Sequence, residues 1–175
     1  MKAPDQLNRI HALAGMLGNH PHSGARVGQL TLPELGALVV VAGRASGFWV
    51  GTETRCDLAT QHMIDCVWFD DPSHNNPVVA WEFDARDVAR SHLEGSGRRR
   101  GTFEKLRGFK NAIKVQALYS IRGKRMLSKQ TYLDDAAFQK RVSGDPIKIY
   151  TDEELISGKL LEIVNEGWRM RGIAG

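Results

Sequence analysis

The chain has 175 residues, of which 42% are hydrophobic and 25% are charged, and its formal net charge is +4. These values are typical of one folded domain, and they exclude collagen-like, coiled-coil and wholly disordered chains. Two cysteines without a CxxC pair exclude a disulfide framework and a structural zinc site. The N-terminus lacks an apolar signal-peptide core, and the most apolar stretch, Leu35–Val41, is too short to span a bilayer, so we expect a cytoplasmic protein without a membrane partner.

Hydrophobic periodicity, capping signals and turn residues predict the elements. Thr31 with Glu34, and Thr151 with Glu154, have the spacing of capping boxes that open helices. In chain order we expect a helix over 5–18, a helix over 31–46, a short strand over 48–50, strands over 63–69 and 78–84, a helix over 86–94 and a flexible basic loop over 95–101. These are followed by a helix over 103–113 capped by Thr102, a strand over 114–121, a helix over 135–142, a strand over 146–150 and a helix over 154–167. This order predicts an α/β fold, with residues 1–175 forming a single domain whose mixed β-sheet is flanked by helices. We expect Trp49, Trp68 and Trp81 to lie in the core, since large aromatic residues at strand positions usually do.

Three carboxylates lie on the two strands over 63–69 and 78–84, which we expect to form an antiparallel hairpin. Glu82 and Asp84 share one face of their strand because side chains alternate, and Asp65 lies on the neighbouring strand. Paired strands are roughly 4.8 Å apart, so the three carboxylates could converge on one divalent cation that offsets their repulsion. A solvent-exposed face of the hairpin, or structural ion pairs with arginine, would explain the same pattern.

The same residues resemble a known nuclease group. Ile64-Asp65 in an apolar strand, followed after a loop by Glu82-Phe83-Asp84 at the end of another, resembles the PD-(D/E)XK nuclease superfamily. The resemblance covers roughly residues 31–122 and includes the helix and strand that follow. It implies a restriction-endonuclease-like fold and Mg²⁺-dependent hydrolysis of DNA phosphodiester bonds, with Asp65, Glu82 and Asp84 as catalytic metal ligands and Mn²⁺ as a substitute ion.

One position departs from the superfamily pattern. Asp84 stands where members usually carry lysine, so Lys105, Lys110 or Lys114 would have to reach back to the site, and we take Lys105 as the catalytic residue. On a helix, Lys105 and Glu104 differ by about 100° in direction, so only one of them can face the ion. Glu34 matches an acid on the superfamily's first helix, but its capping-box position explains it equally well.

Positive charge is concentrated between Arg98 and Lys129, where 11 basic residues accompany one acidic residue. This asymmetry indicates a polyanionic partner, although a solvated basic surface would have the same composition. The expected nucleic-acid contacts, which would bind phosphates without reading sequence, are Arg98, Arg99, Arg100, Lys105, Arg107 and Lys110. DNA is the expected partner, RNA is not excluded, and the resemblance allows a homodimer. The alternative function is a catalytically inactive protein of this fold that binds nucleic acid within a larger assembly.

Overall fold

The computed structural model of this chain describes residues 5, 8–10, 12, 13, 16, 30–57, 60–86, 95–96, 99–121, 127–144 and 146–172. The described residues between 5 and 16 are helical, in agreement with the predicted N-terminal helix. Beyond Arg86, the predicted helix over 86–94 lies outside the described residues. No helix in the described part of the chain combines the length and the apolar character needed to cross a membrane.

A five-stranded mixed sheet forms the centre of the molecule, with the strand order β1-β2-β3-β6-β7. Its strands are β1 (Trp49–Asp57), β2 (Thr60–Phe69), β3 (Pro77–Ala85), β6 (Ile113–Tyr119) and β7 (Lys148–Thr151). Antiparallel pairing joins β1 to β2 and β2 to β3, whereas parallel pairing joins β3 to β6 and β6 to β7. The α/β class, the mixed sheet and the predicted hairpin of β2 and β3 are confirmed.

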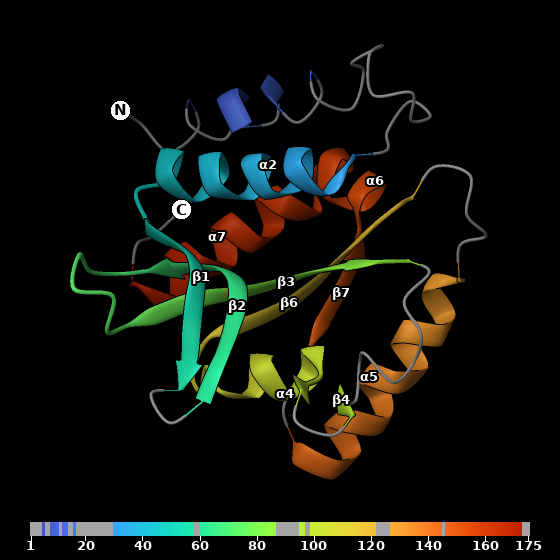
Figure 1. The fold of residues 1–175 in the computed structure, drawn as a ribbon. Coiled ribbons are helices and arrows are strands. Elements are labelled where there is room, and N and C mark those ends of the chain that lie inside the picture. Colours follow the sequence, from blue (N-terminus) through green and yellow to red (C-terminus); the bar gives the residue numbers. More distant parts are fainter. Residues whose placement is uncertain are drawn as a thin grey trace.

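Helices cover both faces of the sheet (Figure 1). On one face lie α2 (Leu32–Ala45) and α7 (Leu160–Met170), and on the other lie α4 (Thr102–Arg107) and α5 (Lys129–Ser143). The larger core lies beneath α2 and α7 and contains Trp68 and Trp81, both fully buried. Gly43 allows α2 to approach the sheet closely, because a Cβ there would lie 2.5 Å from Trp68 Nε1.

Strand β1 is much longer than the predicted strand over 48–50. It is an edge strand with several exposed polar residues, so its sequence lacks the apolar alternation that would have revealed it. The prediction that Trp49 lies in the core is wrong, since its side chain is 51% exposed at the start of β1. Within the same strand, Glu53 adopts a left-handed backbone conformation with φ 47°.

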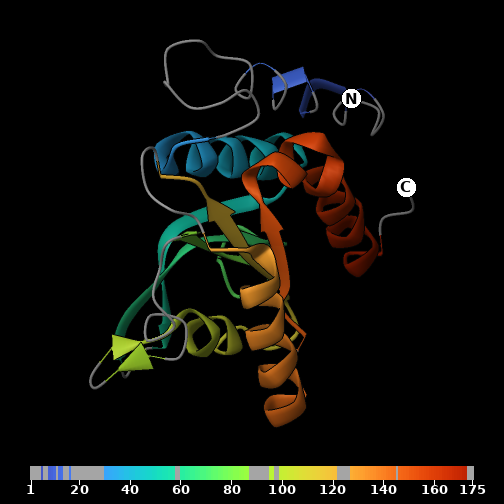
Figure 2. The same ribbon diagram turned by 90° about the vertical axis from the view of Figure 1, so that its right-hand side faces the viewer.

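The region after β3 also differs from prediction. Where we expected an irregular loop over 95–101, β4 (Gly95–Ser96) and β5 (Arg99–Arg100) form a short antiparallel ribbon beside α4 (Figure 2). Helix α4 has six residues instead of the predicted eleven, because Gly108 follows its last turn. Its N-cap is Gly101 and not Thr102.

Helix α5 begins at Lys129, six residues before the predicted start of the helix over 135–142. Tyr132 and Ala136, four residues apart, belong to the same buried cluster. The apolar face of this helix therefore begins before residue 135, where the predicted helix starts.

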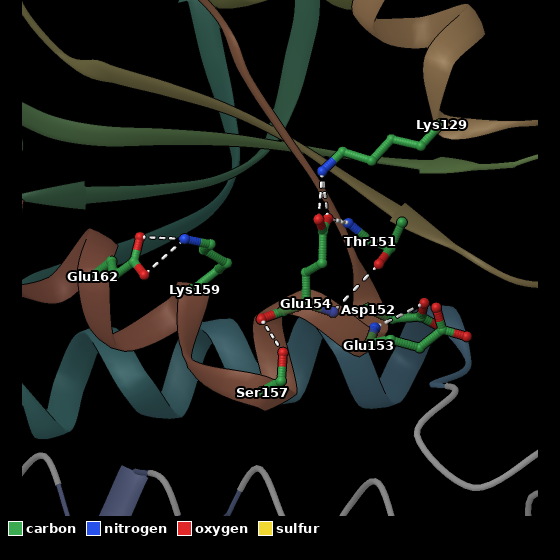
Figure 3. A network of polar contacts seen from close by, with 8 residues as sticks. All are labelled: Lys129, Thr151, Asp152, Glu153, Glu154, Ser157, Lys159 and Glu162. Atoms are coloured by element: carbon green, nitrogen blue, oxygen red, sulfur yellow. Dashed lines mark hydrogen bonds and ion pairs between the residues drawn. The ribbon is translucent and has the colours of Figure 1, made fainter.

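The C-terminal helical segment starts with the predicted capping box (Figure 3). Glu154 N donates to Thr151 Oγ1 at 3.2 Å, and Thr151 N donates to Glu154 Oε2 at 2.9 Å. Lys129 also donates to both carboxylate oxygens of Glu154 at 2.6 Å, which ties α5 to the short helix α6 (Asp152–Glu154). Residues Leu155–Lys159 (η2) then lead into α7 through a kink at Gly158, whose φ is 134°.

Candidate functional site

Asp65 and Glu82 lie where the pairing of β2 with β3 ends. The ladder runs from Phe69 and Pro77 to Cys66 and Trp81, and the two acids are the next residues on their strands. Asp65 Oδ2 accepts a hydrogen bond of 2.6 Å from the backbone N–H of Phe83, so the carboxylate satisfies an amide that the ladder leaves unpaired. Burial raises the pKa of Asp65 despite this hydrogen bond.

The buried carboxyl group of Glu82 contacts the half-buried side chain of Lys105. Lys105 Nζ, carried by α4, lies 2.8 Å and 3.0 Å from the two carboxylate oxygens of Glu82, which is only 3% exposed. Burial raises the pKa of Glu82 to about 8, and the negative charge of Asp65 adds to this shift. Burial on its own would lower the pKa of Lys105, but Glu82 and the neighbouring aspartates raise it overall, so the ammonium group stays charged at neutral pH.

Asp84 is held by two side chains that sequence reasoning missed. Its Oδ2 accepts hydrogen bonds from Thr102 Oγ1 at 2.7 Å and from Gln116 Nε2 at 2.8 Å. We expected Thr102 to cap a helix, but its hydroxyl is directed to Asp84 instead. Gln116 is fully buried on β6 beside Glu82, and a polar residue inside a largely apolar strand was the available signal for it.

The described residues include no group of three or more His, Cys, Asp or Glu side chains placed to hold a metal ion. The structure therefore does not bring Asp65, Glu82 and Asp84 together as one three-ligand group; each carboxylate has its own protein partner. Mg²⁺, however, is commonly held by one or two carboxylates, with water and substrate phosphate supplying the other ligands. Asp65 and Glu82 are the first residues beyond the last β2–β3 pair, and the charge of Asp65 contributes to the raised pKa of Glu82.

The remaining predicted residues lie on or near α4. Lys105 faces Glu82 while its neighbour Glu104 is exposed, as the 100° separation requires. Lys110 is exposed shortly after α4, and Arg107 is half-buried in the last turn of that helix. Arg99 and Arg100 form β5, next to the N-cap of α4, and Arg98 lies outside the described residues.

Glu34 belongs to the capping box of α2 and not to the acidic site. Its Oε2 accepts hydrogen bonds of 2.7 Å from both the backbone N–H and the hydroxyl of Thr31. The capping interpretation of Glu34 is therefore confirmed.

Taken together, the site combines a buried carboxylate of raised pKa, a charged lysine and two further carboxylates at the end of a strand pair. Shifted ionisable groups concentrate at functional sites because proton transfer and charge stabilisation require them. Comparisons with protein-family models, curated proteins and solved structures find no match to this chain.

Proposed function

We propose that this protein is a divalent-metal-dependent endonuclease that hydrolyses DNA phosphodiester bonds. The observation that carries the proposal is the buried Glu82–Lys105 pair, with Asp65 and Asp84 acting electrostatically on both members. A carboxyl group and an ammonium group shielded from solvent add little stability over well-packed apolar side chains of the same size. Their presence at the end of a strand pair is therefore better explained by chemistry than by folding.

The order of elements supports a restriction-endonuclease-like fold, as the sequence resemblance to the PD-(D/E)XK superfamily implies. Helix α2 precedes the antiparallel strands β1, β2 and β3, and α4 connects β3 to the parallel strand β6. The two acidic strands are adjacent in the sheet, which such a site requires.

Lys105 supports the proposal because it can supply the lysine that the superfamily pattern has at the position of Asp84. Asp84 occupies the usual lysine position, and the ammonium group of Lys105 reaches Glu82 from the following helix. A charged amine at this point can donate to a phosphate oxygen and stabilise the negative charge that develops in the transition state.

The other groups have separate roles in the proposed reaction. Asp84 is held through Oδ2, and its Oδ1 can orient a water molecule for attack on phosphorus. Asp65 and Glu82 would hold Mg²⁺ or Mn²⁺, which when bound supplies Lewis-acid polarisation of the phosphate and a water of lowered pKa. Arg100 and Arg99, one and two residues before Gly101, the N-cap of α4, would bind the phosphate backbone.

Incubation with supercoiled plasmid and Mg²⁺ or Mn²⁺ tests the proposal. The parent protein should convert the plasmid to nicked circles, and Glu82→Gln, which keeps the side-chain shape but cannot ionise, should be slower by about 100-fold. Equal nicking by both proteins would show that Glu82 has no part in the reaction, and intact plasmid with both would exclude the enzyme.

The second candidate function is an inactive protein of this fold that binds nucleic acid. It is favoured by the separate protein partner of each of the three carboxylates, and by the absence of a three-ligand group among the described residues. A plasmid that is retarded in a gel but stays supercoiled with both metal ions would support this function over the enzyme.

A further inference from the structure

An open groove with a volume of about 570 Å³ lies between α2 and the sheet, next to Asp65. We call it the α2 pocket. Its helix side includes Gly36, Ala37 and Val40, and the half-buried ring of Phe83 lines its sheet side. The pocket is open to solvent at Ala37 and Glu53, which are both exposed. Its volume is within the range of small-molecule sites.

Two carboxylates, Asp65 and Glu53, give the otherwise apolar α2 pocket its polar character. They lie opposite each other, because Thr52 pairs with Cys66 and Thr54 pairs with Ile64 on either side of them. Glu53 is exposed, and within the described residues neither carboxylate forms an ion pair. The pocket therefore offers hydrogen-bond acceptors beside apolar walls, which suits a flat ligand that carries N–H donors.

We infer that the α2 pocket binds a nucleobase with an exocyclic amino group, which is adenine, cytosine or guanine. The ring would lie against the apolar wall, as bases do on aromatic side chains, and the amino group would donate to Glu53 or Asp65. Thymine has a carbonyl group in place of this donor. The choice of a nucleobase as ligand rests on the proposed function, because Asp65 belongs to both the pocket and the acidic site.

Titration with free deoxynucleosides, without metal, tests the inference on the full chain. Chemical-shift changes should show that deoxyadenosine, deoxycytidine or deoxyguanosine binds at least about five-fold more tightly than thymidine, because only these bases carry an exocyclic amino donor. Glu53→Gln should reduce this preference. Equal binding of all four nucleosides, or binding of none, would overturn the inference.

A matched pair of variants on α2 locates the binding. Ala37→Leu fills the α2 pocket and should weaken nucleoside binding by about five-fold or more. Val41→Leu adds bulk at an exposed position of the same helix outside the pocket, and it should leave binding unchanged. Equal binding by parent, Ala37→Leu and Val41→Leu would place the ligand elsewhere and contradict the inference. Because Glu53 is exposed, Glu53→Gln provides a test even if Ala37→Leu does not fold.

Single-stranded oligonucleotides identify the source of the base. If the ligand is a nucleic-acid strand, a deoxycytidine decamer should bind more tightly than deoxycytidine and more tightly than a thymidine decamer. If the ligand is a free nucleotide, deoxycytidine should bind as tightly as the deoxycytidine decamer. The pocket and the proposed function can fail independently. Plasmid nicking without nucleoside binding overturns only the pocket, and nucleoside binding without nicking overturns only the enzyme.

Discussion

Lys105 and Glu82 form the contact on which the candidate site depends. Asp84 stands where the superfamily pattern has a lysine, and the sequence offered three other lysines that could take its place. The structure brings one of them, Lys105, to within 2.8 Å of Glu82. Asp65 and Asp84 act on both groups through their charge, so the four residues behave as one electrostatic unit. Substitutions of Glu82 or Lys105 are therefore expected to change both the rate of DNA cleavage and the pH dependence of stability.

Lys105→Ala should lower the rate of plasmid nicking by about 100-fold, because it removes the charge that would stabilise the transition state. Glu82 already holds its proton at neutral pH, so loss of the lysine leaves no unpaired buried charge, which limits the loss in free energy of unfolding to about 1–3 kcal/mol. Single-turnover cleavage and urea denaturation measure the two effects. Lys159→Ala, which breaks an exposed pair with Glu162, is the control and should change neither. Unchanged cleavage by Lys105→Ala would remove this lysine from the mechanism.

The free energy of unfolding should fall as the pH rises from about 4.5 towards 8. The folded protein keeps the proton of Glu82 up to a pKa of about 8, whereas the unfolded chain releases it near 4.5. Between these values the folded state binds more protons, so rising pH costs up to about 1.4 kcal/mol of stability per unit. Urea denaturation at pH 5, 6, 7 and 8 should therefore give a steeper decline for the parent than for Glu82→Gln. Parallel curves for the two proteins would contradict the raised pKa.

The sequence was enough to place the three carboxylates on strands, but not to predict their hydrogen-bond partners. Alternation along the strands placed Asp65, Glu82 and Asp84 on two neighbouring strands, because strand periodicity is a local property. Thr102 and Gln116 were missed because their contacts with Asp84 join residues 18 and 32 positions apart. Such contacts depend on the path of α4 and β6, which local patterns do not specify.

At the scale of elements, prediction succeeded where capping or apolar patterns were strong. Helix α2 and the C-terminal helical segment begin at the predicted capping boxes, and β3 and β6 follow apolar runs. It failed for β1, an edge strand with exposed polar residues, and for the short helix α4. At both, tertiary contacts rather than local propensity decide the structure.

Helix α2 provides a matched test of its packing on the sheet. Gly43→Ala should lower the free energy of unfolding by about 1–3 kcal/mol, because the new Cβ would lie 2.5 Å from Trp68 Nε1 and force a shift. Gly36→Ala meets only an ordinary contact of 3.8 Å with Phe83, and it should stabilise the helix by up to about 1 kcal/mol. Chemical denaturation of both variants checks this, and equal effects would contradict the close approach at Gly43.

Across the whole molecule, the modest net charge of +4 conceals the strongly basic segment from Arg98 to Lys129. Strand β5 and helix α4 belong to this segment, and Lys105 of α4 contacts Glu82, so positive charge and the acidic site meet at α4. An enzyme that hydrolyses a polyanion needs basic residues near its acidic site, because they must hold the nucleic-acid backbone with its phosphates next to the carboxylates.

Replacement of Arg98, Arg99 and Arg100 by glutamine should weaken DNA binding and its dependence on salt. Each lost phosphate contact should reduce the slope of log K against log salt concentration by about 0.9. Fluorescence anisotropy with a labelled duplex at several salt concentrations measures the slope. Arg169→Gln, on the exposed surface of α7, is the control and should leave it unchanged. An unchanged slope in the triple variant would show that the ribbon does not contact the phosphates.

Binding of Mn²⁺ to the full chain, followed by electron paramagnetic resonance without nucleic acid, is the most direct test that Asp65 and Glu82 jointly hold a divalent cation. The parent should bind a single ion, and Asp65→Asn and Glu82→Gln should each weaken binding by about 10-fold or more, because each removes a carboxylate ligand. Glu162→Gln, at a position 61% exposed and paired with Lys159, should bind like the parent. Equal affinity in all four proteins, or no bound ion in the parent, would contradict the account.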